Sequence, residues 1–340
     1  MIEMRKVMAV ALAAALAVPA ALAYDFKVGA VDYNFVSNRK AVNVTYEELG
    51  QGAYSGKVRI PYEVSYQMQS LPVKGVGDFA FLNSQMMDTC ELPEGVTSIG
   101  QQAFSHCYYM TSVSLPSTLR TLKDYAFEYC EDMPALHLPA SLAQIGEGVF
   151  YDCLSLAEFT IDEENTHFCT PGGVLYTTGN TELVCYPVGR QSLTYTVAEG
   201  TTVLRDYSFA KARLEHITLP VSLEKIGDVT FMEAISFKSV ASLNPVPPVG
   251  QEIIFEPSVY SNAVLYVPQE SIEAYRSAEG WSQFRDIRGI DASTAVVESE
   301  AEINGPVYTL TGVKVADSAE DIATLPAGLY VVSGKVIVKK

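Results

Sequence analysis

The chain has 340 residues, of which 48% are hydrophobic and 19% charged, a composition typical of a folded protein with a large buried surface. It carries 40 acidic against 23 basic residues, for a formal net charge of −17. Binding to nucleic acid or to an anionic membrane surface needs clusters of Lys and Arg, so neither is an expected partner.

Residues 1–23 are typical of a secretory signal peptide. A basic pair ending at Lys6 precedes an apolar run, and small residues up to Ala23 stand where a signal peptidase cleaves. The run contains Pro19 and is shorter than the ~20 apolar residues that cross a bilayer. We therefore expect export of a mature chain that begins at Tyr24 and has no membrane-spanning segment.

A tandem repeat with units of about 23 residues occupies residues 76–250. Each unit has an apolar-x-x-apolar-x-apolar segment, as at Met110, Val113 and Leu115, whose alternating end predicts a short strand. A coil of this length cannot close a core alone, so successive coils must stack. The pattern predicts a solenoid in the leucine-rich-repeat class, built mainly of short parallel strands and turns. One phenylalanine marks each unit: Phe81, Phe104, Phe127, Phe150, Phe209 and Phe231.

A column of cysteines accompanies this phenylalanine ladder. Cys107, Cys130 and Cys153 each follow a marker phenylalanine by three residues, so stacking places them together, facing the core. Strands ~4.8 Å apart permit a disulfide, but parallel side chains and an odd number disfavour one. The spacing also lacks the C-x-x-C pairs of structural zinc sites. We interpret the column as packed core, with a strained bridge or a metal column as the alternatives.

These units resemble the BspA-like leucine-rich-repeat surface proteins of Bacteroidetes-type bacteria. The resemblance rests on repeated segments such as Val96–Gly100 and Ala103–Cys107. It implies a β-rich N-terminal cap at 24–75, a hairpin insert at 162–200 within the array and a closing segment at 251–290. It also implies adhesion to, or recognition of, host matrix proteins or neighbouring cells.

One position departs from the repeat. Lys123 stands where other units carry a glycine, as at Gly100 and Gly146. The departure raises the question of how strictly that turn requires glycine.

The last fifty residues differ from the array. Residues 291–306 are small, acidic and aperiodic, which indicates a linker. Residues 307–340 contain short strands separated by glycine turns, and they are similar to the C-terminal β-sandwich sorting domains of the type IX secretion pathway. This resemblance implies a sorting tail, and a tail retained for another purpose, such as anchoring, is the alternative.

The sequence offers no convincing catalytic or metal site. His167 and Cys169 lie two residues apart, which in an extended segment separates them by about 6 to 7 Å at Cα, and no orienting acid has the spacing of a triad. The acidic run 162–164 lacks the alternating ligands of a calcium loop. If Tyr176 pairs with Thr181 in the hairpin, Cys169 and Cys185 are out of register, although export would permit a disulfide. No cofactor is expected.

The outward positions of the strands form the candidate binding face. A solenoid's strand face commonly holds a partner, whereas a solvated sheet face is the plainer interpretation. Tyr108, Tyr109, Tyr129 and Tyr151 cluster beside the cysteine column and offer further contact area. The candidate face consists of Thr89, Glu91, Ser112, Ser114, His137, Glu158, Thr160, His216 and Thr218.

These features predict a secreted or cell-surface, non-enzymatic protein that binds an extracellular partner, either a protein or a glycan. A basic protein partner would favour Glu91 and Glu158. The competing hypotheses are a structural spacer of the cell envelope and a glycan-processing or proteolytic enzyme, for which no convergent acids are found.

Overall fold

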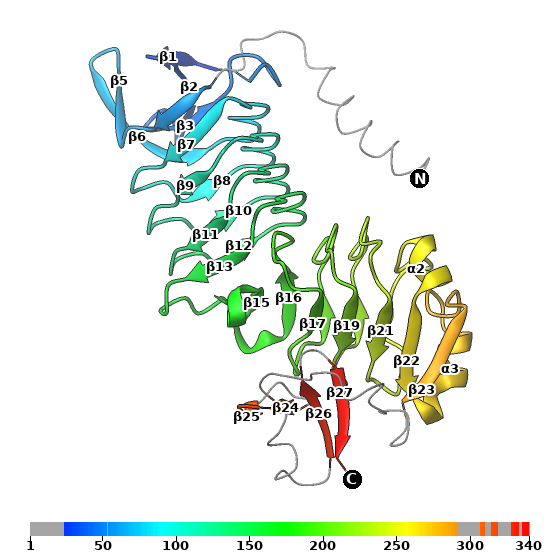
Figure 1. Cartoon of the computed structure of the whole chain (residues 1–340). Coiled ribbons are helices and arrows are strands. Elements are labelled where there is room, and N and C mark those ends of the chain that lie inside the picture. Colours follow the sequence, from blue (N-terminus) through cyan, green and yellow to red (C-terminus); the bar gives the residue numbers. More distant parts are fainter. Residues whose placement is uncertain are drawn as a thin grey trace. The chain divides into compact units, whose positions relative to one another are not determined.

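The computed structural model divides the chain into two compact units, residues 1–154 and 155–340, which we call the first and second units. The expected signal peptide and linker lie outside the described residues. Within each unit, successive turns of the chain stack as coils (Figure 1). The structure describes residues 24–52, 54–290, 307–309, 314–318, 328–332 and 335–339.

Two sheets line the first unit. One has the strand order β1-β2-β3-β6-β8-β10-β12, with β5 paired to β6, and the other has the order β4-β7-β9. Pairing is antiparallel from β1 to β3 and parallel from β3 onward. The strands are β1 (Phe26–Val28), β2 (Val31–Val36), β3 (Ala41–Thr45), β4 (Gly56–Arg59), β5 (Glu63–Tyr66), β6 (Gln69–Val76), β7 (Met87–Glu91), β8 (Ser98–Ile99), β9 (Ser112–Ser114), β10 (Thr121–Leu122), β11 (Ala135–Leu138) and β12 (Gln144–Ile145).

The second unit has sheets of order β14-β15-β16-β18-β20 and β17-β19-β21-β22-β23, and a tail sheet β25-β24-β26-β27. Its elements are β13 (Glu158–Ile161), β14 (Phe168–Cys169), η1 (Pro171–Gly173), β15 (Leu175–Thr177), η2 (Thr178–Asn180), β16 (Glu182–Cys185), β17 (Thr194–Thr196), β18 (Val203–Leu204), β19 (His216–Leu219), β20 (Lys225–Ile226), β21 (Ser239–Ser242), α2 (Pro257–Asn262), β22 (Val264–Pro268), η3 (Gln269–Ser271), α3 (Ile272–Ser277), β23 (Asp286–Ile290), β24 (Val307–Thr309), β25 (Lys314–Ala316), β26 (Gly328–Val332) and β27 (Lys335–Lys339).

The predicted solenoid of short parallel strands is confirmed. In the first unit β7 pairs in parallel with β9, and in the second unit β19 pairs in parallel with β21. The second apolar cluster of each repeat also forms a strand, as β8, β10 and β12 show. Each coil therefore contributes one short strand to either side of its core.

A ladder of aromatic rings fills the space between coils. All six marker phenylalanines are buried. In the first unit the centroid of Phe104 lies 4.8 Å from that of Phe81 and 5.1 Å from that of Phe127, with the rings nearly parallel. In the second unit Phe209 and Phe231 stack at 5.4 Å. Offset stacking at these distances adds to the apolar area that the rings bury.

The ladder also includes rings that the repeat pattern did not predict. Tyr54 meets Phe81 edge to face at 4.8 Å, and Tyr186 and Phe255 extend the stack in the second unit. The closing segment then covers Phe255 with Trp281, whose indole nitrogen donates a 2.8 Å hydrogen bond to the Pro248 carbonyl. The exposed end of the last coil is thereby closed.

The hairpin insert is narrower than predicted. Strands β14, β15 and β16 form an antiparallel meander, but β16 and β17 also pair in parallel with β18 and β19. Tyr186 takes the phenylalanine's place on Phe209. Residues 182–200 thus form a further coil of the solenoid. The sequence pattern did not reveal this coil, because Tyr186 replaces the marker phenylalanine.

The structure describes the tail at residues 307–309, 314–318, 328–332 and 335–339. Its described strands form one antiparallel sheet, in which β24 lies between β25 and β26, and β26 pairs with β27. The described part of the tail contains no second sheet facing this one.

A close approach between coils explains the repeated glycine. A Cβ on Gly146 would collide with Oδ1 of Asp124 and lie 2.7 Å from its backbone nitrogen. That carboxylate accepts a 3.0 Å hydrogen bond from the Glu147 backbone. Gly100 and Gly227 make the same approach to an aspartate of the preceding coil. Glycine is therefore needed wherever the preceding coil presents this aspartate.

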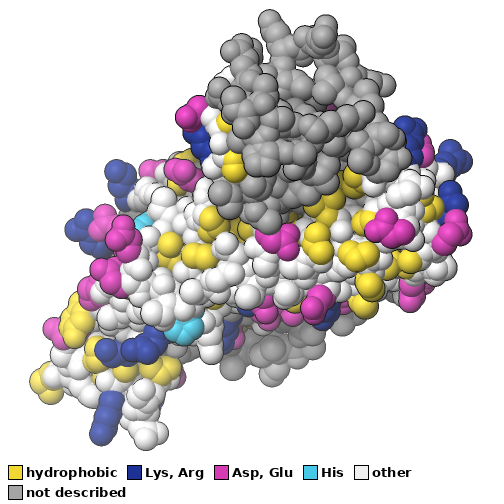
Figure 2. All heavy atoms as spheres, turned by 90° about the horizontal axis from the view of Figure 1, so that it is seen from below, with side chains coloured by type: hydrophobic (Ala, Val, Ile, Leu, Met, Phe, Trp, Pro, Cys, Tyr) yellow, Lys and Arg dark blue, Asp and Glu magenta, His cyan; other side chains and the backbone are white. Residues whose placement is uncertain are grey.

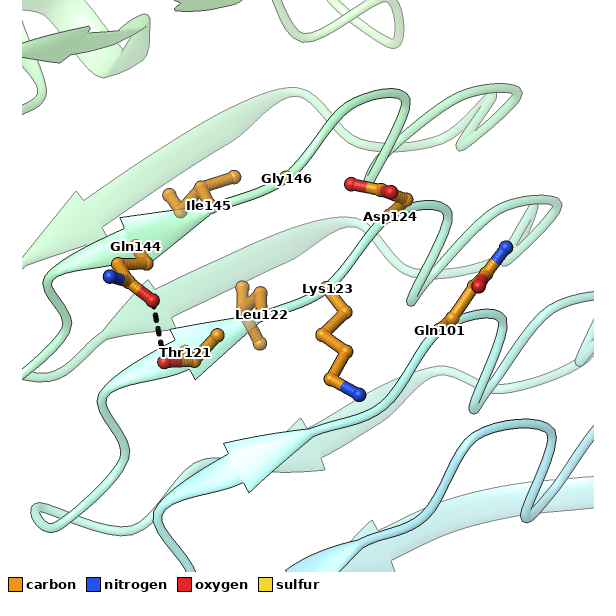
Figure 3. Close-up of a pocket in the computed structure, with 8 residues that line it drawn as sticks. All are labelled: Gln101, Thr121, Leu122, Lys123, Asp124, Gln144, Ile145 and Gly146. Carbon is orange, nitrogen blue, oxygen red and sulfur yellow. Dashed lines mark hydrogen bonds between the residues drawn. The ribbon is translucent and has the colours of Figure 1, made fainter.

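Lys123 is tolerated because its preceding coil has no such aspartate. In the register that places Gly146 against Asp124, Lys123 lies against Gln101 of the preceding coil. Gln101 has no carboxylate at this place. Its side chain extends toward the neighbouring coil (Figure 3), and its ammonium pairs with Asp78 two coils away at 3.0 Å. The replacement of glycine by Lys123 is therefore accompanied by the replacement of aspartate by Gln101 in the preceding coil.

We expect Gly146→Ala to lower the free energy of unfolding by about 1–3 kcal/mol, because the new methyl group must push two coils apart. Asp124→Ala removes the carboxylate that the methyl group meets, so Gly146→Ala should cost measurably less in that background. Chemical denaturation of the two single variants and the double variant measures this coupling. Strictly additive losses would contradict the proposed contact.

Candidate functional site

The candidate face of the first unit is a flat ladder of short polar side chains. On β7 and β9, Thr89 lies opposite Ser112, and Glu91 lies opposite Ser114. Glu91, Ser112 and Ser114 are exposed, and Thr89 is half-buried. His137 on β11 is also exposed. The arrangement presents hydroxyl groups at the surface, and none of these five residues is deeply buried.

Strand β4 adds two basic residues that the sequence analysis assigned only to the cap. Lys57 lies opposite Thr89, and Arg59 lies opposite Glu91. Arg59 donates a 2.6 Å hydrogen bond to the Glu91 carboxylate, which lowers the carboxyl pKa. The sequence contains a signal that β4 belongs to the array, because Val58, Ile60 and Pro61 repeat its pattern of a strand followed by proline.

This pairing changes the expected role of Glu91. Both side chains of the pair are exposed, so the pair is solvated and screened by salt. A basic partner would have to displace Arg59 before it could reach Glu91. The N-terminal end of the strand face is therefore mixed in charge, not acidic.

In the second unit the candidate residues differ in exposure. Glu158 and Thr160 on β13 are exposed. His216 is half-buried, with its Nδ1 2.7 Å from the Ser239 hydroxyl. The prediction that Thr218 faces solvent is wrong, since it is only 8% exposed. Its short side chain lies on a central strand, between Thr196 and Ala241 of the flanking strands.

The face presented in Figure 2 carries acidic side chains dispersed among polar and hydrophobic ones.

On the other sheet of the first unit there is a shallow depression of about 250 Å³. It opens between the coils of β10 and β12, beside Lys123 and Asp124, and Thr121 donates to Gln144 across it (Figure 3). The residues that line the depression include one carboxylate, that of Asp124, and one ammonium group, that of Lys123.

The cysteine column is part of the core. Cys107, Cys130 and Cys153 are fully buried, and each thiol donates a hydrogen bond of 3.1–3.3 Å to a phenylalanine carbonyl of the preceding coil. Burial raises the pKa of Cys107 to about 12 and that of Cys130 well above its usual value. A thiol in this state is neither a nucleophile nor a metal ligand.

Cys169 and Cys185 are not bonded to each other. All six cysteines lie in the described part of the chain and are free thiols. The hairpin register considered in the sequence analysis is wrong, because Tyr176 pairs with Leu183 and Cys185 lies opposite Leu175. Cys169 lies opposite Tyr176 on the other side of β15. One strand therefore separates the two thiols.

The described residues contain no group of three His, Cys, Asp or Glu side chains arranged to hold a metal ion. Among the same residues, no helix has the length and apolar character needed to cross a membrane. His167 and Cys169 lie on the insert without an acid that orients them.

Comparison with known proteins now identifies the repeat. Residues 63–171 and 193–268 match the family described as "BspA type Leucine rich repeat region", in six copies. The chain belongs to the BspA-type leucine-rich-repeat family. Proteins of this kind use their repeats for interactions with other molecules. No curated protein sequence matches the chain significantly.

Several solved structures are similar to this chain at low sequence identity. The pneumococcal vaccine antigen PcpA is 17% identical, with 78% of this chain and 98% of that chain covered and a TM-score of 0.50. A leucine-rich cell surface protein from Faecalibacterium prausnitzii is 16% identical, with 81% and 97% covered and a TM-score of 0.46. A leucine-rich-repeat protein from Bacteroides ovatus is 17% identical, with 78% and 77% covered and a TM-score of 0.45.

We expect a thiol-alkylating reagent at pH 8 to leave the three column cysteines unmodified in the folded protein. All three are buried, and the pKa values of Cys107 and Cys130 are raised, so almost no accessible thiolate is present. Half-buried Cys169 should react first. Mass spectrometry of native and denatured samples measures this order. Early labelling at Cys130, or a mass two hydrogens short of six thiols, would contradict the structure.

Proposed function

We propose that the chain is an exported, non-enzymatic surface protein whose repeats bind an extracellular protein partner. The observation that carries the proposal is the exposed ladder of β7 and β9, where Ser112 and Ser114 leave the backbone open to approach. Small side chains on a stack of parallel strands suit a partner that is laid along the sheet.

Two features favour this proposal over a spacer or an enzyme. A spacer needs no particular surface chemistry, whereas this ladder combines hydroxyls with the charged pair of Arg59 and Glu91. An enzyme needs perturbed titratable groups gathered in a cleft, and the depression near Lys123 is shallow and carries a single carboxylate.

Export is proposed from the N-terminal segment, and anchoring or sorting from the tail. The resemblance of residues 307–340 to type IX sorting domains supports a role in secretion or attachment, because the tail follows the closing segment and lies outside the repeats. The partner's surface would then meet the array and not the tail.

We expect Ser114→Arg to weaken binding of the mature chain to its partner by about tenfold or more, because a long charged side chain would separate the two surfaces. Gln144→Arg, on the exposed face of β12, is the matched control and should bind normally. Both are measured by surface plasmon resonance against a panel of extracellular-matrix proteins. Equal affinity of the two variants would remove the strand face from the proposal. If the unaltered chain bound no protein of the panel, the spacer would become the better hypothesis.

We expect the protein recovered outside the cytoplasm to begin at Tyr24, because small residues precede it at the predicted cleavage site. N-terminal sequencing of the secreted or surface-attached chain measures this. An intact Met1 on protein retained in the cytoplasm would contradict export.

A further inference from the structure

Three successive coils of the first unit turn at residues 102–109, 125–132 and 148–153, which together we call the turn edge. Its aromatic rings meet across the coils. The centroid of the His106 ring lies 4.5 Å from that of Tyr129 and 5.5 Å from that of Tyr108. Tyr129 in turn meets Tyr151 edge to face at 5.6 Å. Tyr109, beside them, is 59% exposed.

Carboxylates surround these rings. The turn edge contains Glu128, Glu131, Asp132 and Asp152 and no Lys or Arg. Burial, followed by the charges of Glu131, Asp152 and Glu128, raises the pKa of the Tyr108 hydroxyl. Three acids from two coils therefore act on one tyrosine at the protein surface.

A chain of hydrogen bonds holds the His106 ring in place. Glu128 is only 4% exposed and accepts from the Ser105 hydroxyl at 2.9 Å and from Gln102 at 3.2 Å. The Ser105 hydroxyl lies 2.7 Å from Nδ1 of His106. Because that hydroxyl donates to Glu128, Nδ1 carries the hydrogen of this contact. The imidazole is thereby fixed beside Tyr129 before any partner arrives.

The backbone of this turn is left-handed at Tyr129. Tyr129 has a φ of 57°, a left-handed conformation that a bulky residue rarely adopts. The same position is left-handed in the other coils too, at Asn83, His106, Asp152, Lys211 and Glu233, so the turn imposes this conformation whichever residue it carries. Tyrosine here costs backbone energy that asparagine would largely avoid.

We propose that the turn edge is a docking surface for a Lys- or Arg-rich segment of a protein partner. A cation is attracted to the face of an aromatic ring within about 6 Å of its centroid. Glu128 and Asp152 are buried, but Glu131 is half-buried and Asp132 exposed, so the last two carboxylates can attract a cation directly. The strand face is less suited to such a segment, because Lys57 and Arg59 lie at its edge. The inference rests on the proposed function, since it names the chemistry of the protein partner.

The test uses the mature chain, residues 24–340, and a fluorescein-labelled hexa-arginine peptide at physiological salt, with affinity measured by fluorescence anisotropy. We expect Tyr129→Asn, which suits the left-handed backbone but lacks the ring, to weaken binding about tenfold. Tyr129→Phe keeps the ring and should stay within about twofold of the unaltered chain. Glu131→Gln should weaken binding several-fold, roughly as expected for one lost charge contact.

Glu163→Gln is the matched control, because it removes one exposed carboxylate from the second unit and should leave binding unchanged. Equal losses in Glu131→Gln and Glu163→Gln would mean attraction by overall charge and would overturn the proposal. Unchanged binding in both Tyr129→Asn and Glu131→Gln would also overturn the proposal. Glu131→Gln leaves the strained turn at Tyr129 intact. Binding of a neutral glycan that depended on Tyr129 would assign the surface to carbohydrate instead. A matrix protein that still bound both variants fully would overturn this docking surface but leave the proposed function standing.

Discussion

The structure depends on one constraint, which is that a single coil cannot cover its own apolar ring. Phe104 is buried only because Phe81 and Phe127 lie on either side of it at about the thickness of a coil. Every unit therefore needs a neighbour, and the last one needs a closing segment that places Trp281 against Phe255. The buried thiols follow from the same stacking, since each donates to the coil before it. Stability is shared between neighbours and does not belong to any one repeat.

Because of this stacking, the residue at one position restricts which residue can stand at the adjacent place in the next coil. Where one coil presents an aspartate, as at Asp124, the next must carry a glycine to let its backbone approach. Where the earlier coil carries Gln101, the next accommodates Lys123. A residue in this fold is thus best understood together with the residue one repeat away, because that is its nearest neighbour in space.

Repetition also sets what the surface can do. Any outward position recurs from coil to coil, so strands present ladders such as Thr89 with Ser112, and turns present columns such as His106 with Tyr129. The first is small, polar and flat, and the second is aromatic and acidic. Both are formed by residues one repeat apart in the chain, so the first unit presents two surfaces of different chemistry.

The sequence by itself determined the period, the phenylalanine ladder, the buried cysteine column and the solenoid class, because these depend only on which residues repeat along the chain. The tertiary structure determined which residues lie opposite each other across neighbouring strands and coils. It paired Glu91 with Arg59, buried Thr218 between neighbouring strands, placed β15 between Cys169 and Cys185, and revealed a coil at 182–200. These outcomes depend on register across strands and on replacement of the marker phenylalanine by tyrosine. A repeat pattern shows which face a side chain takes, whereas only the assembled coils determine how much of that face its neighbours leave open.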